Sequence, residues 1–483
     1  MRPRARIGLE RRKAPWLGRL VIGALPLGFA ACGEGASTVL EPASAPPLVL
    51  WIEVDTLRAD ALGCYGAGLL GPDSPDLTPN LDALAAEGLR FDAAYATAPW
   101  TLPSLASAFT GKWPWDHGTT KLLAKLGQGH VTIAERMQEV GYRTAGVMTN
   151  FVATGAYGFD QGFDLWDDSL ALGHQGSTSM EATELLLAQH DELAKLDQPI
   201  FLFELLFEPH WRYELHEGIE LGADSNGRMA KLADIAEARR LLADGDLNDG
   251  DLAQLRLLYA GEVARVDAAI GKLIDGLKER GVWEDALVLF TVDHGELLGE
   301  EGWIGHTKSL SDELVRVPLI WKLPRQQASG DGDPGLDQAG QVIATPVSQV
   351  DLHSTLLDLV GAAFEHEHIP SRSFANLMRG PMAASAFQPR EDLFLHVNFE
   401  PLKSGSDSLV KRTHKWGVVK ASDGTKWTVD HFAPGGPAGA LVDPNSDPTE
   451  AVDLSGRLTE LELAKYWRLE GLVPRALGTK SGG

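Results

Sequence analysis

The stretch most informative about the architecture is LVLWIEVDTLRAD, residues 48–60. Its first seven residues are mostly apolar and have the length of a strand, and Asp55 follows them at once. In an open α/β sheet, ligands gather beyond the carboxyl ends of the strands. Asp55 is therefore the first candidate for a functional residue.

Strand-like and helix-like segments alternate along the rest of the chain. The strand candidates are 143–149, 199–207, 286–292 and 317–323, and the helix candidates are 77–88, 132–140, 252–277 and 350–360. This alternation predicts an α/β fold in which a mainly parallel sheet is sandwiched by helices. After about Gly361 the strand candidates are short, without long helices between them: 393–397, 416–419 and 427–429. We therefore expect an α/β domain over 48–361 and a smaller C-terminal α+β subdomain over 362–483.

The chain of 483 residues is acidic, with 43 Lys plus Arg against 67 Asp plus Glu and a net charge of −24. Nucleic-acid binding requires clustered cations, so this balance argues against such a partner. The sequence holds two cysteines, Cys32 and Cys64, and a disulfide scaffold is not expected.

The first 31 residues reverse this charge, because they hold seven cations and one acid and end in an apolar run. This pattern predicts a secretory signal peptide over 1–31, followed by a linker over 32–47. The sequence FAACG, residues 29–33, is similar to a bacterial lipobox, which predicts lipidation of Cys32. An ordinary cleavage site beside an incidental cysteine is the alternative. We expect an exported protein of the periplasm or cell envelope, held at the membrane by an N-terminal lipid anchor.

Polar side chains also follow two other strand candidates. His210 lies three residues past the run that ends at Phe207, and Asp293 and His294 directly follow the run that ends at Val292. Each residue alone could be a helix cap, a loop residue or a surface histidine. Their shared position after strands instead predicts a metal site with carboxylate oxygens and an imidazole nitrogen as ligands.

Five blocks, in order along the chain, resemble the sulfatase family of the alkaline phosphatase superfamily. They are DTLRADALGCYG (55–66), TPNLDALAAEGLRF (78–91), APWTLPSLASAFTG (98–111), DHGELLGEEGWIG (293–305) and LVRVPLI (314–320). The resemblance implies that Asp55, Asp293 and His294 bind a divalent metal ion. It also implies that Thr101, at the start of a helix, is the catalytic nucleophile and a further metal ligand.

Thr101 departs from the family's C/S-x-P-x-R motif, because the chain reads TLPSL over residues 101–105. Sulfatases of this family oxidise the Cys or Ser to formylglycine, whereas an oxidised Thr would be a ketone that hydrates poorly. The resemblance therefore implies a formylglycine-independent variant, and relatives with Thr at this position act on phosphorus. Coordination to a metal ion lowers the pKa of a hydroxyl, so Thr101 can still serve as the nucleophile.

The ligand types favour manganese or zinc over calcium, because an imidazole takes the place of an oxygen ligand. The remaining site candidates come from the same resemblance. They are His210 and His306 as catalytic groups, and Lys308, Arg58 and Asn150 as substrate-binding residues. Five tryptophans near these motifs could form an aromatic wall for the substrate: Trp100, Trp113, Trp115, Trp211 and Trp303.

Together these features predict a metal-dependent, sulfatase-like hydrolase that cleaves sulfate esters or, preferentially, phosphate esters. Its substrate would be a small molecule or an ester group on a glycan or lipid. One alternative is a phosphoryl-group transferase resembling the phosphoethanolamine transferases, although no transmembrane helices are predicted before its catalytic domain. The other is a noncatalytic, membrane-tethered binding protein, which would not need the complete set of metal ligands.

Overall fold

The computed structural model describes residues 45–71, 75–173, 178–232, 234–325, 339–362, 369–399, 413–420, 426–430 and 438–442. The predicted signal peptide, Cys32 and most of the predicted linker lie outside the described residues, as does the end of the predicted C-terminal subdomain. Within the described ranges, no helix has the length and apolar character needed to cross a membrane.

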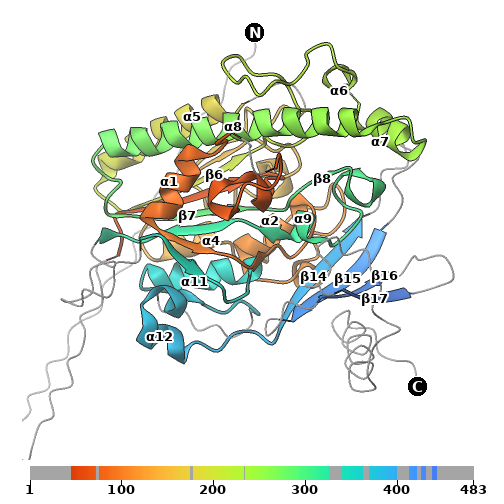
Figure 1. Ribbon diagram of the computed structural model, residues 1–483. Helices are drawn as coiled ribbons and strands as arrows, with labels where there is room; N and C mark the ends of the chain where they lie inside the picture. Colours follow the sequence, from red (N-terminus) through yellow and green to blue (C-terminus); the bar gives the residue numbers. More distant parts are fainter. Residues whose placement is uncertain are drawn as a thin grey trace, which may run out of the picture. The chain divides into compact units, whose positions relative to one another are not determined.

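The fold centres on an eight-stranded sheet with the strand order β12-β2-β11-β7-β1-β6-β4-β5 (Figure 1). Its strands are β1 (Leu48–Val54), β2 (Leu89–Phe91), β4 (Arg143–Met148), β5 (Leu165–Asp167), β6 (Ile200–Leu206), β7 (Ala286–Val292), β11 (Leu319–Lys322) and β12 (Gln341–Ile343). The central strand β1 is parallel to β6 and β7, β4 is parallel to β6 and β5, and β11 is antiparallel to β7 and β2. Every residue of β1, β6 and β7 is buried, which explains their continuous apolar runs.

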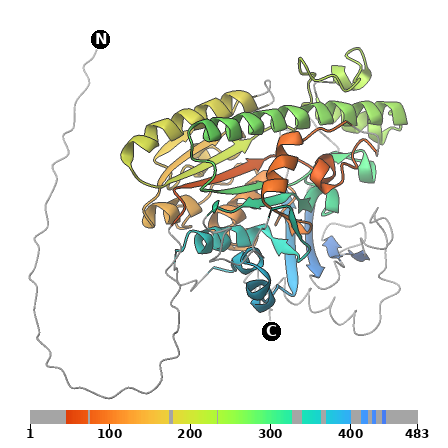
Figure 2. The ribbon, with the colours of Figure 1, turned by 60° about the vertical axis from the view of Figure 1, so that its left-hand side comes forward.

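Helices cover both faces of this sheet (Figures 1 and 2). One layer holds α1 (Pro79–Glu87), α5 (Ser179–Leu193) and α8 (Asp249–Glu279), and the other holds α2 (Thr101–Thr110), α4 (Ile133–Glu139) and α11 (Leu352–Leu359). The predicted helix over 252–277 is the middle of α8, which begins with a capping box between Asn248 and Asp251. The predicted α/β fold with a mainly parallel, helix-covered sheet is confirmed.

Shorter elements surround this framework. Two small sheets contain β3 (Ala94–Tyr95), β10 (Arg316–Val317) and β13 (Val347–Ser348) in one and β8 (Leu297–Leu298) and β9 (Ile304–Gly305) in the other. The shorter α-helices are α3 (Pro114–His117), α6 (Arg228–Lys231), α7 (Ile235–Ala243), α9 (Asp312–Val315) and α12 (Pro381–Ala386). Short 3-10 helices span Ala59–Ala61, Gly63–Tyr65, Gly155–Tyr157, Ala194–Leu196, Glu300–Gly302, Gln349–Asp351 and Ala375–Met378.

A four-stranded antiparallel sheet follows near the end of the described chain. Its strands, in spatial order, are β14 (Asp392–Phe399), β15 (Thr413–Lys420), β16 (Lys426–Asp430) and β17 (Ala438–Val442). The backbone N–H of His396 in β14 donates to the carbonyl of Thr97 at 2.8 Å, just before α2. This contact brings the C-terminal sheet beside the start of α2, where Thr101 lies. The domain boundary expected between 361 and 362 stays a prediction.

Candidate active site and metal centre

The predicted metal ligands follow neighbouring strands of the large sheet. Strands β1 and β7 are parallel neighbours, so Asp55 and Asp293 leave the sheet at the same edge. Asp55, Asp293 and His294 are fully buried, and their ligand atoms all lie within 4.8 Å of one another. Thr101 is the first residue of α2, and Trp100 takes the N-cap position before it. Four residues from three distant parts of the chain therefore meet at one point.

The distances between these side chains suit ligands that share one ion. His294 Nε2 lies 3.6 Å from Asp55 Oδ1 and 3.5 Å from Asp293 Oδ2. The same nitrogen lies 3.4 Å from Thr101 Oγ1. Ligand atoms bound about 2.1 Å from a tetrahedral ion are roughly 3.4 Å apart. The cluster thus has the spacing of a metal site.

The hydrogen bonds around the cluster leave its inward-facing atoms available for a cation. Asp293 Oδ1 accepts from the backbone N–H groups of Thr56 and His294. In contrast, Asp55 Oδ1 and Asp293 Oδ2 are buried and have no hydrogen-bond partner in the described part of the chain. His294 Nδ1 lies 2.8 Å from the carbonyl oxygen of Gly295, which can only accept, so Nδ1 donates and Nε2 keeps its lone pair.

The electrostatics of the buried acids also favour a metal ion at this cluster. Burial raises the pKa of Asp55 well above its usual range, and the carboxylate of Asp293 raises it further. Burial also raises the pKa of Asp293, and it lowers the pKa of His294 far below its usual value. Two adjacent carboxylates and a neutral imidazole in a dry site are stabilised when a divalent cation binds between them. The residues present therefore fit a metal ion.

Asn150 connects the metal cluster to the predicted nucleophile. It lies just past β4, and its Nδ2 donates to Asp55 Oδ2 and, at 3.3 Å, to Thr101 Oγ1. Its Oδ1 accepts from the backbone N–H of Val152 at 2.8 Å, which fixes the orientation of the amide. Asn150 can therefore hold the hydroxyl of Thr101 in position as well as face a substrate.

The two predicted catalytic histidines lie beside the metal cluster. The ring centroids of His306 and His294 are 4.6 Å apart, and those of His306 and His210 are 5.1 Å apart. His306 Nδ1 contacts Glu296 Oε1 at 2.9 Å, and burial raises the pKa of Glu296 to about 7. Sequence reasoning missed Glu296, although it lies only two residues after His294. Both imidazoles are placed where they could donate a proton to a leaving group.

A pocket of about 170 Å³ opens over Thr101. Its polar lining consists of Thr101, Asn150, His210, Arg239, His306 and Thr307, and its apolar lining consists of Trp100, Leu122, Phe151, Val152 and Phe399. Arg239 belongs to α7, a short helix that lies outside all the motifs described above. No sequence pattern identified Arg239, because its position in the pocket depends on how α7 packs.

Two predicted substrate-binding residues are not brought to this pocket. Arg58 is 5% exposed, forms a paired contact with Asp60 and also contacts Glu300 at 3.0 Å. Lys308 Nζ lies 4.6 Å from the ring centroid of Trp303. Neither of the two belongs to the pocket lining. Of the five tryptophans expected to form an aromatic wall, only Trp100 is among the lining residues, so most of that wall is formed by other side chains.

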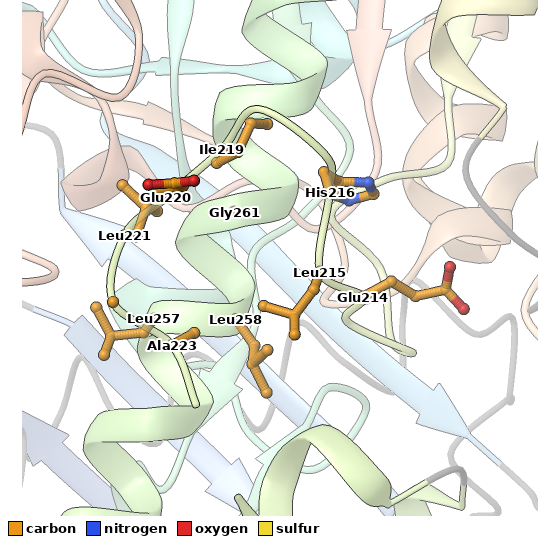
Figure 3. Close-up of a pocket in the computed structure, with 11 residues that line it drawn as sticks. Glu214, Leu215, His216, Ile219, Glu220, Leu221, Ala223, Leu257, Leu258 and Gly261 are labelled. Atoms are coloured by element: carbon orange, nitrogen blue, oxygen red, sulfur yellow. The ribbon is translucent and has the colours of Figure 1, made fainter. Parts of the chain in front are cut away.

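A larger cavity of about 340 Å³ lies elsewhere, between the loop 214–223 and α8 (Figure 3). Leu257, Leu258 and Gly261 of α8 form one side, and the loop carries Glu214 and His216. His216 is paired with the buried carboxylate of Glu262 at 2.7 Å. None of the predicted site residues lines this cavity, so the smaller pocket over Thr101 is the candidate active site.

A buried cluster of metal-ligand type, next to a hydroxyl under a small pocket, is the arrangement of a metal-dependent ester hydrolase. The model of the sulfatase family matches residues 47–362, which is more than half of the chain. The chain therefore belongs to the sulfatase family. Enzymes of this family and of the related alkaline phosphatases generally depend on a divalent metal ion.

Curated relatives agree with this assignment. An uncharacterised sulfatase of Escherichia coli K12, YidJ, is 27% identical over 358 residues, covering 65% of this chain and 67% of that protein. The choline-sulfatase of Rhizobium meliloti is 27% identical over 375 residues, covering 66% and 68% of the two chains. Family membership makes the chain an ester hydrolase, and the alternative of a noncatalytic binding protein is set aside.

Solved structures show the same fold. The phosphonate monoester hydrolase of Agrobacterium radiobacter has a TM-score of 0.66 and 21% identity, covering 89% of this chain and 96% of that one. BT4656, solved with its substrate D-glucosamine-2-N,6-O-disulfate, has a TM-score of 0.65 and 20% identity, covering 91% and 99%. At these identities the likeness extends to the fold alone. Proteins with this fold thus include both a phosphonate monoester hydrolase and a protein whose structure was solved with a sulfated sugar as its substrate.

Proposed function

We propose that the protein hydrolyses phosphate esters in preference to sulfate esters, with Thr101 as the nucleophile. One observation carries the proposal: Thr101 Oγ1 lies 3.4 Å from His294 Nε2 within the candidate metal centre and also lines the pocket. A hydroxyl in this position can reach both a metal ion and a bound ester.

In the proposed reaction, the Thr101 hydroxyl releases its proton to solvent, and the resulting Oγ1 alkoxide attacks the phosphorus atom opposite the leaving group. The bond between phosphorus and the leaving oxygen breaks, and that oxygen takes a proton from His210 or His306. Water then hydrolyses the phosphothreonine and regenerates the hydroxyl. Asn150 orients Thr101 through its 3.3 Å hydrogen bond. A divalent ion held by Asp55, Asp293 and His294 would lower the pKa of the Thr101 hydroxyl and offset the negative charge of the ester.

The preference for phosphorus rests on the residues at the start of α2. Threonine cannot yield the aldehyde that the family's sulfatases use, and Leu105 stands where their motif has arginine. Leu105 is fully buried in α2. Lys308, which was predicted to bind the substrate, lies over the Trp303 ring and outside the pocket lining. A threonine hydroxyl beside a metal ion is a suitable nucleophile for phosphorus.

The test compares chromogenic phosphate and sulfate esters that share the p-nitrophenolate leaving group. We expect metal-loaded protein to cleave p-nitrophenyl phosphate or bis(p-nitrophenyl) phosphate faster than p-nitrophenyl sulfate. Thr101→Ala should lower turnover by roughly 10³-fold or more, because the nucleophile is lost. Thr110→Ala is a matched control, since Thr110 is a buried threonine at the other end of α2 whose hydroxyl donates to the carbonyl of Ala106 in the same helix.

Three outcomes would overturn the proposal. Faster cleavage of the sulfate would contradict the phosphorus preference, and full activity of Thr101→Ala would remove Thr101 as nucleophile. Transfer of the phosphoryl group to an added alcohol in preference to water would instead favour the transferase alternative.

We further propose that the ion is manganese or zinc and that the protein is exported and lipid-anchored. The cluster of two carboxylates, one imidazole and one hydroxyl suits these ions better than calcium. The anchor would be attached at Cys32, which lies outside the described residues. If the anchor is correct, Cys32→Ser should move the protein from the membrane fraction to the soluble periplasmic fraction, and an unchanged distribution would contradict it.

A further inference from the structure

Two threonines at the candidate active site have a left-handed backbone conformation, which is unfavourable for a side chain branched at Cβ. Among the described residues other than glycine, positive φ angles occur at Thr56 (55°), Ala67 (46°), Leu123 (68°), Asp197 (50°), Glu301 (51°) and Thr307 (74°). Strained residues of this kind persist only where the surrounding structure holds them, and they occur often at ligand sites. The contacts of each threonine therefore need an explanation.

The conformation of Thr56 is explained by the metal centre. Its backbone N–H donates to Asp293 Oδ1 at 3.2 Å. Its carbonyl accepts from the hydroxyl of Tyr259 in α8 at 2.7 Å. The left-handed turn at Thr56 thus lets a backbone N–H orient one of the predicted metal ligands.

The conformation of Thr307 is not explained in this way. Its backbone N–H donates to the carbonyl of Pro99 at 3.3 Å, which is a long hydrogen bond. Thr307 is half-buried and lines the pocket over Thr101. Its hydroxyl forms no hydrogen bond with any residue that the structure describes. Because the backbone N–H is already used by Pro99, the hydroxyl is the donor that Thr307 can offer to a ligand.

The neighbours of Thr307 place it at the reacting end of the pocket. Pro99, which accepts its N–H, stands two residues before Thr101. His306, the preceding residue, has its ring centroid 4.6 Å from that of the predicted metal ligand His294. Thr307 is therefore connected to the start of α2 through one contact and to the metal cluster through the other. A ligand group at this end of the pocket is the phosphoryl group of an ester.

We propose that the Thr307 hydroxyl binds the substrate by donating a hydrogen bond to a nonbridging oxygen of the phosphoryl group. This inference rests on the proposed function and adds a substrate-binding residue to it. The acceptor oxygen carries negative charge, so the hydrogen bond is of the stronger, charge-assisted kind. The branched side chain has few χ1 rotamers, and little side-chain entropy is lost when the anion binds.

The closing experiment measures the binding of inorganic phosphate to the Mn²⁺-loaded protein by isothermal titration, so no bond is cleaved. Thr307→Val keeps the shape and the branched Cβ but lacks the hydroxyl. We expect it to weaken phosphate binding by about tenfold or more, because a hydrogen bond to a charged group is lost. Thr307→Ser keeps the hydroxyl and should bind phosphate almost as tightly as the wild type.

A glycine at the same position separates binding from folding. Glycine adopts positive φ angles without strain, so Thr307→Gly should keep or raise the melting temperature. Its affinity for phosphate should nevertheless fall at least as far as in Thr307→Val. Asp197→Gly is the matched control, because Asp197 is an exposed residue of positive φ at the end of the 3-10 helix Ala194–Leu196. This control should leave phosphate binding unchanged.

The possible failures of this inference and of the proposed function are distinguishable. Wild-type affinity in Thr307→Val, or equal losses in Thr307→Val and Thr307→Ser, would overturn the role of the Thr307 hydroxyl alone. A clear decrease in the melting temperature of Thr307→Gly would contradict the strain at this position. If the wild-type protein itself does not bind phosphate, the proposed preference for phosphorus is contradicted, and the role of Thr307 with it.

Discussion

At the scale of single residues, the central sheet contains a carboxylic acid that burial keeps protonated. Glu204 lies in β6 with none of its surface exposed, and its Oε1 accepts from Thr183 Oγ1 at 3.2 Å. Burial raises the pKa of Glu204 to about 8. Its second oxygen has no hydrogen-bond partner within the described ranges. The native protein therefore takes up a proton at Glu204 that the unfolded chain does not hold at neutral pH.

This proton uptake makes stability depend on pH. In the unfolded chain the pKa of Glu204 is about 4.3, and folding raises it to about 8. The free energy of unfolding that Glu204 contributes therefore falls as the pH rises from about 4.3 to about 8, and it is constant above that pH. Glu204→Gln should remove this contribution, so that the variant gains stability relative to the wild type between pH 6 and pH 9. Urea unfolding at both pH values would measure the gain. Glu192→Gln, at an exposed position of α5, should show no such difference, and a constant gap between Glu204→Gln and wild type would contradict the prediction.

At the scale of elements, the loop after β7 positions the site because it packs tightly on α9. The backbone N–H of Gly295 donates to the carbonyl of Leu314 at 2.8 Å. A Cβ atom added to Gly295 would lie 1.9 Å from the carbonyl oxygen of Glu313. The loop that carries His294 and Glu296 can therefore lie where it does only because residue 295 has no side chain.

Gly295→Ala should destabilise the fold and weaken metal binding together. Moving the loop away from α9 is expected to cost roughly 1–3 kcal/mol of unfolding free energy and to displace His294 from the metal centre. Urea denaturation and a titration with Mn²⁺ would measure the two effects. Gly129→Ala is the control, because a Cβ there meets no atom within 4 Å. Unchanged metal affinity in Gly295→Ala would show that the loop tolerates the shift.

The elements also explain how much the sequence could predict. The runs that form β1 and β7 are long, apolar and followed by acids, so Asp55 and Asp293 could be located from the chain alone. Glu296 could not, because its contact with His306 depends on the pairing of β8 with β9, two strands of two residues each. Such short strands leave no periodic pattern in a sequence.

Other elements and residues of the structure also differ from the sequence-based predictions. The helix α5 was not predicted, since its sequence mixes apolar residues with Glu, Gln, His and Asp. The edge strands β5 and β12 and the neighbouring strand β2 were also missed, because they have only three residues each. Arg239 reaches the pocket through the packing of α7, and Arg58 is occupied by Asp60 and Glu300. Contacts between distant segments decide these positions, and no single segment encodes them.

At the scale of the whole molecule, the metal centre joins segments that are far apart in the chain. Asp55, Thr101 and Asp293 follow or begin elements in different parts of the sequence, and the carboxylates among them are buried. An ion that binds only the folded protein stabilises it by an amount that grows with ion concentration. The same ion also relieves the repulsion between the two buried carboxylates.

Removing the metal should therefore lower the melting temperature of the entire described fold. We expect a decrease of several degrees on treatment with EDTA, reversed by Mn²⁺ or Zn²⁺ more effectively than by Ca²⁺. Asp293→Asn should melt at the same temperature with and without EDTA, because a ligand is lost. Asp275→Asn, an exposed position on α8, should keep the full response. Calorimetry would measure all three, and an EDTA-insensitive wild type would contradict a resident ion.

The hydrogen bond from His396 to Thr97 joins the C-terminal sheet to the start of α2. This connection bears on whether substrate affinity or metal binding is lost first when the protein is heated or cut by a protease. Phe399 reaches the pocket only as part of β14, whereas the metal ligands belong to the large sheet and its loops. If the C-terminal sheet opens locally before the large sheet unfolds, substrate affinity would disappear while the ion stays bound. Mild heating or brief proteolysis could then produce a species that still carries its metal but no longer discriminates between esters.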